Sequence, residues 1–277
     1  MVKDDDRARY PAKALCNRTE RLVGAAAMQR LAEAKVIVFG VGGVGSWCAE
    51  SLIRTGIGHV SLVDSDRVCI TNVNRQLQAT CATVGQVKVD ALRNRLLEIC
   101  PHAEVVAHQK IYQEATADDF ALQDFDVVVD AIDSVTNKIL LLYRASQSRA
   151  AVVSSLGAAC KLDPTRIRTA EFMAVKGCPL GAVLRKQMRR TGKLPAKPVL
   201  TVYSDEVLGN AGGAPACGST QCLCPQGEEG PGDADLVNHE WCSQKAIING
   251  SVVHITAIFG FTLAGLVVQH VIGGVKR

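Results

Sequence analysis

The residues with the clearest chemical pattern are the glycines of the segment 40–45, Gly-Val-Gly-Gly-Val-Gly. Glycines at this spacing allow a tight turn and let backbone N–H groups approach a phosphate at the amino end of a following helix. Asp64 comes about twenty residues later, where an acidic residue would bind a ribose hydroxyl. The pattern predicts a nucleotide site, and a close-packed turn without ligand is the alternative. By itself it does not distinguish NAD from ATP.

Polar residues further along the chain separate these two nucleotides. They are Asp64, Asp66, Asn72, Arg75, Gln76, Lys88 and Asp133. A redox dinucleotide is held largely by backbone and ribose contacts, whereas a triphosphate needs cations and a carboxylate for its metal ion. Arg75 and Lys88 can supply the cations and Asp133 the carboxylate. Singly, each has an ordinary explanation, such as a surface cation or a helix N-cap. As a set around a glycine turn, they favour ATP with Mg²⁺.

Positive charge is concentrated in the segment 176–197, which has seven Lys or Arg residues and no acidic residue. Four of the seven recur at helical spacing and would share one face. These four are Arg185, Lys186, Arg189 and Arg190. Such a face suits the phosphates of a nucleic acid, and an ordinary solvated helix is the alternative.

The eleven cysteines do not form the pattern of a secreted disulfide scaffold, because their number is odd and the chain is long. Four could form a zinc set, although their spacings differ from paired C-x₂-C knuckles: Cys217, Cys222, Cys224 and Cys242. Cys160, Cys178 or Cys242 could form a thioester, but no neighbouring residues single one out. We expect thiols without a catalytic role. The amino terminus carries no apolar signal segment, so we expect a cytoplasmic protein.

These side chains need a scaffold that brings their loops together, and the segment 35–156 alternates short apolar strands with helices. The alternation predicts an α/β fold with a doubly wound, mostly parallel, Rossmann-like sheet. The expected strands are 35–39, 59–63, 104–108, 126–130 and 151–154, and the expected helices are 45–55, 86–99 and 134–149. A further helix from about Thr19 to Ala34 should precede them.

The second half of the chain departs from this alternation. We expect a C-terminal extension with extra strands and helices, including a strand over 167–172 and a helix over 179–190. The segment 208–235 is rich in glycine, proline and acidic residues, which is typical of a loop. We therefore expect one domain of 277 residues. It would comprise a helical lead-in (1–34), a nucleotide-binding half (35–156) and a substrate-binding half (157–277).

The segment between Lys245 and Lys276 contains no charged residue, and 255–268 is almost wholly apolar. An apolar run of this length could cross a bilayer. Polar residues and glycines interrupt it, so we predict a buried strand and helix in a core or dimer interface. A membrane-associated carboxyl terminus is the alternative.

The composition sets limits on the binding partners. With 48% hydrophobic and 21% charged residues, the chain is typical of a globular protein rather than a disordered one. Aromatic residues are 4% of the total, which argues against base stacking on an aromatic platform as the main way of holding a ligand. The net charge of +4 is too small to indicate a polyanionic partner by itself.

Five motifs together resemble those of ubiquitin-activating-type adenylating enzymes, a superfamily that includes activators of sulfur-carrier proteins. They are Gly-X-Gly-Gly-Val-Gly-Ser (40–46), Asp-X-Asp (64–66), Asn-X-X-Arg-Gln (72–76), Val-Gly-X-X-Lys (84–88) and Ala-Ile-Asp-Ser (131–134). The strong likeness covers about Arg18 to Leu162. Four further segments are similar to the branch that dehydrates threonylcarbamoyladenosine in tRNA: 18–24, 54–58, 162–165 and 259–261.

This resemblance implies residue roles as well as an activity. Catalysis would depend on Arg18, Arg75, Lys88 and Asp133, with Asp133 as the Mg²⁺ ligand. The ATP-binding residues would be Gly40, Gly42, Gly43, Gly45, Asp64, Asp66, Asn72, Arg75, Gln76 and Lys88. Arg18 would reach the nucleotide of the neighbouring subunit in a homodimer, with Arg21 as its substitute. Partners would be tRNA and, in some relatives, a sulfur-transfer protein.

Three other functions stay open at this point. An activator of a small ubiquitin-like sulfur carrier would use the same nucleotide residues, although the basic segment and the missing cysteine knuckles favour RNA. A regulatory nucleotide-binding subunit would not need the set formed by Arg75, Lys88 and Asp133. An NAD-dependent oxidoreductase would need a hydride-transfer site, and we find none in the sequence.

Overall fold

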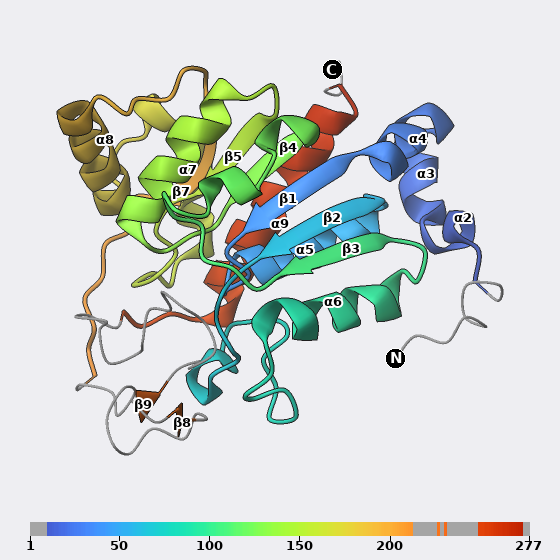
Figure 1. Cartoon of the computed structure of the whole chain (residues 1–277), viewed down its shortest axis with the longest axis horizontal. Helices are drawn as coiled ribbons and strands as arrows, with labels where there is room; N and C mark the ends of the chain where they lie inside the picture. The colour runs from blue at the N-terminus through green and yellow to red at the C-terminus, as the bar shows by residue number, and fades with distance from the viewer. Residues whose placement is uncertain (1–9, 213–225, 228–229, 232–248, 274–277) are drawn as a thin grey trace.

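The computed structural model describes residues 10–212, 226–227, 230–231 and 249–273. A seven-stranded sheet runs through it in the order β3-β2-β1-β4-β5-β7-β6 (Figure 1). The strands are β1 Lys35–Phe39, β2 His59–Val63, β3 Glu104–His108, β4 Val127–Asp130, β5 Ala151–Ser155, β6 Ile167–Glu171 and β7 Leu200–Ser204. All neighbours pair in parallel except β6, which pairs antiparallel with β7 at one edge. The expected mostly parallel α/β sheet is confirmed.

Helices cover both faces of the sheet (Figure 1). They are α2 Ala12–Leu15, α3 Asn17–Val23, α4 Ala25–Glu33, α5 Gly45–Thr55, α6 Lys88–Ile99, α7 Val135–Gln147, α8 Pro179–Thr191 and α9 Val253–Val271. Short 3₁₀ turns are η1 Ile70–Asn72, η2 Ala117–Asp119, η3 Leu122–Asp124, η4 Pro164–Arg166 and η5 Phe172–Ala174, and a two-residue pair is formed by β8 Gln226–Gly227 and β9 Gly230–Pro231.

The buried side chains form two main clusters, one on each face of the sheet. Along β1, Val36 and Val38 belong to the cluster with α5, α6 and α9, whereas Ile37 and Phe39 belong to the cluster with α7 and α8. This alternation follows from the period of two along a strand. Because both faces are covered, the strands are continuous apolar runs, as parallel strands usually are.

Two features of the sequence prediction need correction, and a third is not tested. The single helix expected from Thr19 to Ala34 is two helices, because Gly24 lies between α3 and α4 with φ +82°. Strand β7 was not predicted, although it inserts between β5 and β6. Most of the loop expected over 208–235 lies outside the described residues.

Helix α9 accounts for the apolar carboxyl-terminal segment. Its side chains Ile255, Phe259, Leu263 and Val267 are fully buried, and the helix packs mainly against α5. The predicted buried helix is therefore present, whereas residues 249–252 form no strand. By length and composition α9 could also span a membrane, with 44% of its apolar window buried inside the protein.

Candidate active site

A cavity of about 750 Å³ lies at the carboxyl ends of the central strands. Ligands of open α/β sheets bind at this edge, and this volume is typical of small-molecule sites. Ten residues expected to bind the nucleotide or its metal line this cavity: Gly40, Gly42, Gly43, Asp64, Asp66, Asn72, Arg75, Gln76, Lys88 and Asp133. Gly45 and Arg18 do not line it. The sequence set is thus largely brought together in space.

The glycine turn connects β1 to α5, and its glycines have different reasons to be there. Gly40 has φ +83°, and a Cβ on it would lie 2.7 Å from the backbone oxygen of Ala131. A Cβ on Gly45 would lie 1.9 Å from the backbone oxygen of Gly40, so Gly45 closes the turn rather than facing a ligand. On Gly42, a Cβ would meet only Gln76, at 3.7 Å. Packing within the protein therefore does not require a glycine at position 42, whereas close approach of a ligand would.

Asp64 and Asp66 end β2 and connect the turn to Lys88. Asp64 accepts hydrogen bonds from the backbone N–H groups of Val41 (2.8 Å) and Asp66 (2.9 Å). Asp66 accepts a hydrogen bond from Lys88 Nζ at 2.6 Å. Each carboxylate oxygen retains further acceptor capacity, so Asp64 can still bind a ribose hydroxyl.

Lys88 is held in its charged form although it is buried. Burial would lower the pKa of Lys88, but the carboxylates of Asp66, Asp64 and Asp133 outweigh burial and raise it. Burial raises the pKa of the Asp64 carboxyl, and the Lys88 charge opposes this rise. Lys88 thus stays a charged ammonium in the wall beside the glycine turn, paired with Asp66.

The segment after β2 positions the remaining predicted nucleotide residues. Asn72 accepts a hydrogen bond from the backbone N–H of Cys69 (3.0 Å), and Arg75 donates to the backbone oxygen of Thr71 (2.8 Å). The Trp47 indole donates to the backbone oxygen of Arg75 at 3.0 Å. Gln76 is 6% exposed, and its Oε1 has no hydrogen-bond partner within the described part of the chain. A buried acceptor of this kind is normally satisfied, so a donor on a ligand fits here.

A buried ion pair, not anticipated from the sequence, lies beneath the loop that carries Asp133. Lys138 Nζ and Asp130 Oδ2 are 2.8 Å apart, and both side chains are at most 1% exposed. Lys138 also donates to the backbone oxygen of Ile132 (2.9 Å), and Ser154 donates to Asp130 (2.6 Å). The pair fixes the loop after β4. A lysine followed by Ile-Leu-Leu-Leu in a helix was the available signal.

The residues present fit a magnesium ion that arrives with ATP. Asp133 is an exposed carboxylate on the cavity wall. No cluster of three or more His, Cys, Asp or Glu side chains suitable for a metal occurs within residues 10–212 and 249–273. Mg²⁺ is usually bound by one or two carboxylates together with substrate phosphates, so a single aspartate is sufficient.

The opposite end of the cavity is formed by the loops after β5 and β7, and it contains Lys161. Lys161 is 5% exposed and donates to the backbone oxygens of Ser204 (3.4 Å) and Glu206 (2.5 Å). Lys161 is not among the residues predicted from the sequence, although it directly precedes the motif 162–165. Cys160 and Cys178 also line this end. Cys160 has φ +55°, the single positive φ outside glycine among the described residues.

The four cysteines of the candidate zinc set, and Cys242 as a thioester candidate, lie outside the described residues. Cys160 and Cys178 are free thiols.

The arginines predicted to act from α3 and α8 do not line the cavity of their own chain. That Arg18 reaches the nucleotide of a neighbouring subunit stays a prediction. Arg18 and Arg21 lie on α3, near the amino ends of the strands and away from the cavity (Figure 1). On α8, Arg185 donates to the backbone oxygen of Phe172 (3.1 Å) and lies over the Phe172 ring. Its guanidinium is therefore directed to Phe172. The other three basic residues of that face, Lys186, Arg189 and Arg190, are exposed.

Comparison with known proteins shows which family and which proteins this chain is similar to. The signature of the ThiF family matches residues 16–273. A tRNA threonylcarbamoyladenosine dehydratase of Bacillus subtilis is 42% identical over 190 residues, which are 69% of this chain and 74% of that protein. A protein of the same description from Escherichia coli is 34% identical over 251 residues, 88% of each chain.

A solved structure of a protein with the same description is also similar to this chain. The crystal structure of Escherichia coli tRNA N6-threonylcarbamoyladenosine dehydratase in complex with ATP has a TM-score of 0.76 and 28% sequence identity. The match covers 99% of this chain and 97% of that chain. The described fold, including helix α9, is thus similar to that of an ATP-bound protein.

Proposed function

The chain belongs to the ThiF family, and from this premise we propose that it is an ATP-dependent enzyme that dehydrates threonylcarbamoyladenosine in tRNA. A carboxylate is a poor acylating group, because its leaving group would be oxide. Attack of the threonyl carboxylate on the α-phosphate of ATP releases pyrophosphate and gives an acyl-adenylate. The carbamoyl group of the same side chain then attacks the acyl carbon, and AMP leaves as the ring closes.

One observation carries this proposal. A single cavity combines the glycine turn, the cations Arg75 and Lys88, and Asp133, in a chain that matches an ATP-bound dehydratase over nearly its whole length. Lys88 and Arg75 would stabilise the negative charge that develops on the phosphates during the first step. Mg²⁺ held by Asp133 would add positive charge at the same phosphates. Ring closure is intramolecular, so proximity accounts for much of its acceleration without a protein nucleophile.

The partners belong to the same proposal. The tRNA would contact Lys186, Arg189 and Arg190 on α8, a helix that begins at the cavity with Pro179 and Leu180 in its wall. In a homodimer, Arg18 of one subunit would complete the site of the other. The organisation as one domain, a sulfur-transfer partner, a cytoplasmic location and membrane contact through α9 stay predictions.

The test is a reaction of purified protein with ATP and tRNA that carries threonylcarbamoyladenosine. We expect one AMP for each nucleoside converted, and a nucleoside product lighter by one water in mass spectrometry. The control is the same tRNA without the modification, which should release no AMP. Release of AMP with a ubiquitin-like protein but not with modified tRNA would contradict the proposal and identify a sulfur-carrier activator instead.

A further inference from the structure

Lys161 is a buried cation that the reaction described above does not use. Its two acceptors, the backbone oxygens of Ser204 and Glu206, are neutral. No carboxylate of the described chain forms an ion pair with it. A buried ammonium without a counterion is costly, and an ammonium has three N–H donors, of which two are used here. The remaining donor can serve an anion in the cavity.

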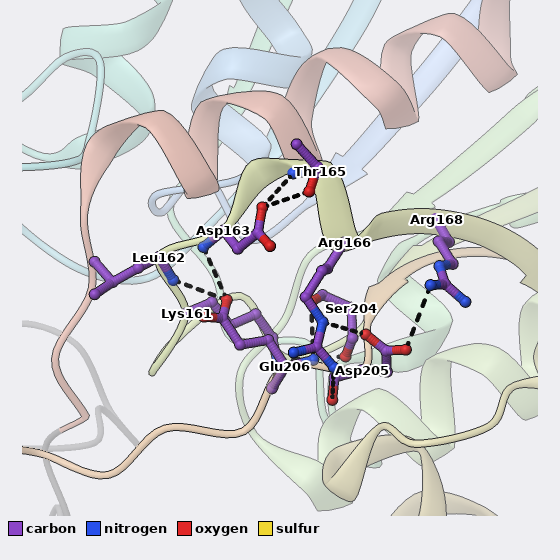
Figure 2. A network of polar contacts seen from close by, with 9 residues as sticks. All are labelled: Lys161, Leu162, Asp163, Thr165, Arg166, Arg168, Ser204, Asp205 and Glu206. Atoms are coloured by element: carbon purple, nitrogen blue, oxygen red, sulfur yellow. Dashed lines mark hydrogen bonds and ion pairs between the residues drawn. The ribbon is translucent and has the colours of Figure 1, made fainter.

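The acidic side chains near Lys161 are engaged with other groups, as Figure 2 shows. Glu206 accepts hydrogen bonds from the backbone N–H groups of Leu162 (2.9 Å) and Asp163 (3.0 Å). Asp205 pairs with Arg166 at 2.8 Å and with Arg168 at 3.6 Å. Burial lowers the pKa of Lys161, and the opposing attraction of Cys178 and Glu206 does not cancel this effect. The positive charge is thus under-compensated in this structure.

The position of Lys161 separates it from the residues expected to hold the triphosphate. Its Nζ lies at the carboxyl end of β7, where it contacts Ser204. In the sheet, β4 and β5 lie between β1 and β7. At the usual spacing of about 4.8 Å, three strand steps place the two ends roughly 14 Å apart. Lys161 and the glycine turn therefore face the same cavity from different ends.

We propose that Lys161 binds the carboxylate that is to be adenylated, and so forms the acid subsite of the cavity. This inference rests on the proposed function and names the residue that recognises its substrate. A carboxylate that approaches a triphosphate is repelled by it, and the repulsion is strong where water is excluded. The Lys161 ammonium offsets this repulsion in the first step. Adenylation then converts the carboxylate into an acyl–phosphate anhydride whose acyl carbonyl oxygen is uncharged, which weakens the contact before ring closure.

The test compares Lys161→Met with Lys197→Met. Lys197 is a matched control, because its Nζ also donates to two backbone oxygens, those of Ser148 (2.5 Å) and Ala150, and burial also lowers its pKa. However, Lys197 does not line the cavity. Binding of tRNA with and without threonylcarbamoyladenosine is measured by fluorescence anisotropy in the presence of an ATP analogue that cannot be cleaved between its α- and β-phosphates. ATP affinity is measured by calorimetry.

We expect the wild-type protein and Lys197→Met to prefer the modified tRNA. In Lys161→Met, affinity for the modified tRNA should fall about ten- to a hundredfold, which is typical for loss of a hydrogen bond between charged groups. Affinity for unmodified tRNA and for ATP should not change. Lys161→Gln keeps a donor without the charge, and it should lose the preference as well. It serves as the second variant if Met disturbs folding.

The other outcomes overturn the assignment in distinguishable ways. A folded Lys161 variant that retains the wild-type preference would show that Lys161 does not bind the acid, while the proposed function stands. Loss of ATP affinity in Lys161→Met would assign the lysine to the nucleotide instead. A wild-type protein that binds both tRNAs equally and releases no AMP would contradict both proposals.

Discussion

The two ends of the cavity each contain one buried lysine, and the two lysines are in opposite electrostatic states. At the end formed by β1 and β2, Lys88 pairs with Asp66, and surrounding carboxylates raise its pKa. At the end formed by β7, Lys161 contacts neutral backbone oxygens, and burial lowers its pKa. A lysine that is paired with carboxylates has its charge fixed before any ligand arrives. A lysine without such a partner gains most when an anion binds.

The largest effect is expected from Lys88→Met at the first end. The variant removes a cation from the phosphate site, together with the ion pair between Lys88 and Asp66. We expect ATP–pyrophosphate exchange with modified tRNA to fall about 100- to 1,000-fold, the usual result of removing one stabilising group. Lys110→Met is the control, because Lys110 also lines the cavity but pairs with Asp119 at the surface. An exchange rate within tenfold of the wild type would show that Lys88 does not act on the phosphates.

A substitution in the glycine turn should separate folding from binding at this same end. Gly45→Ala places a methyl group against the backbone oxygen of Gly40, so the turn must shift. We expect the free energy of unfolding in urea to fall by about 3 kcal/mol. Gly42→Ala has room for its methyl group, so stability should be retained while ATP binds more weakly. Equal stability losses in both variants would contradict this division of roles.

Charge reversal on α8 tests whether tRNA binds next to the end of the cavity that β7 forms. Replacing Lys186, Arg189 and Arg190 with Glu should weaken tRNA binding about 100-fold and reduce the dependence of log affinity on log salt by about three. ATP affinity should stay unchanged. Lys13→Glu is a single charge reversal on α2, away from α8, and should leave tRNA binding nearly unchanged. Unaltered tRNA binding in the triple variant would make this face an ordinary solvated surface.

The elements that the sequence predicted well are those specified by neighbouring residues. Strands β1 to β5 are short apolar runs that end in glycines or polar residues, and their bounds agree closely with the prediction. The helix before β1 was wrong because Gly24 interrupts an otherwise helical pattern. Strand β7 has the β-branched pattern Val-Leu-Thr-Val-Tyr at 199–203, but it falls outside the strand–helix alternation that guided the analysis.

The side-chain contacts that were missed join different elements of the fold. Lys161 contacts Ser204 and Glu206, more than forty residues away in the chain. Lys138 is a lysine at a buried helix position, and its partner Asp130 becomes evident only when β4 and α7 are placed together. Arg185 shares the helical spacing of its basic neighbours, but spacing does not reveal that Phe172 lies beneath it. Periodicity predicts faces of elements, whereas partners of buried charges require the tertiary structure.

The smallest expected effect is a difference in the pH dependence of stability between the two lysines. The pKa of Lys161 is lowered in the folded state, so just below its ordinary value of 10.5 the unfolded chain binds more protons. Stability contributed at Lys161 therefore rises with pH in that window. For Lys88 the pKa is raised, so its contribution to stability is complete below pH 10.5 and is lost only as pH rises further.

Urea unfolding of wild type and Lys161→Met from pH 7 to 10.5 should show the wild type gaining stability relative to the variant. Lys197→Met should show the same trend, because burial lowers the pKa of Lys197 too. A constant difference across this range would mean that Lys161 is compensated by a negative charge, and the contrast between the two ends of the cavity would no longer hold.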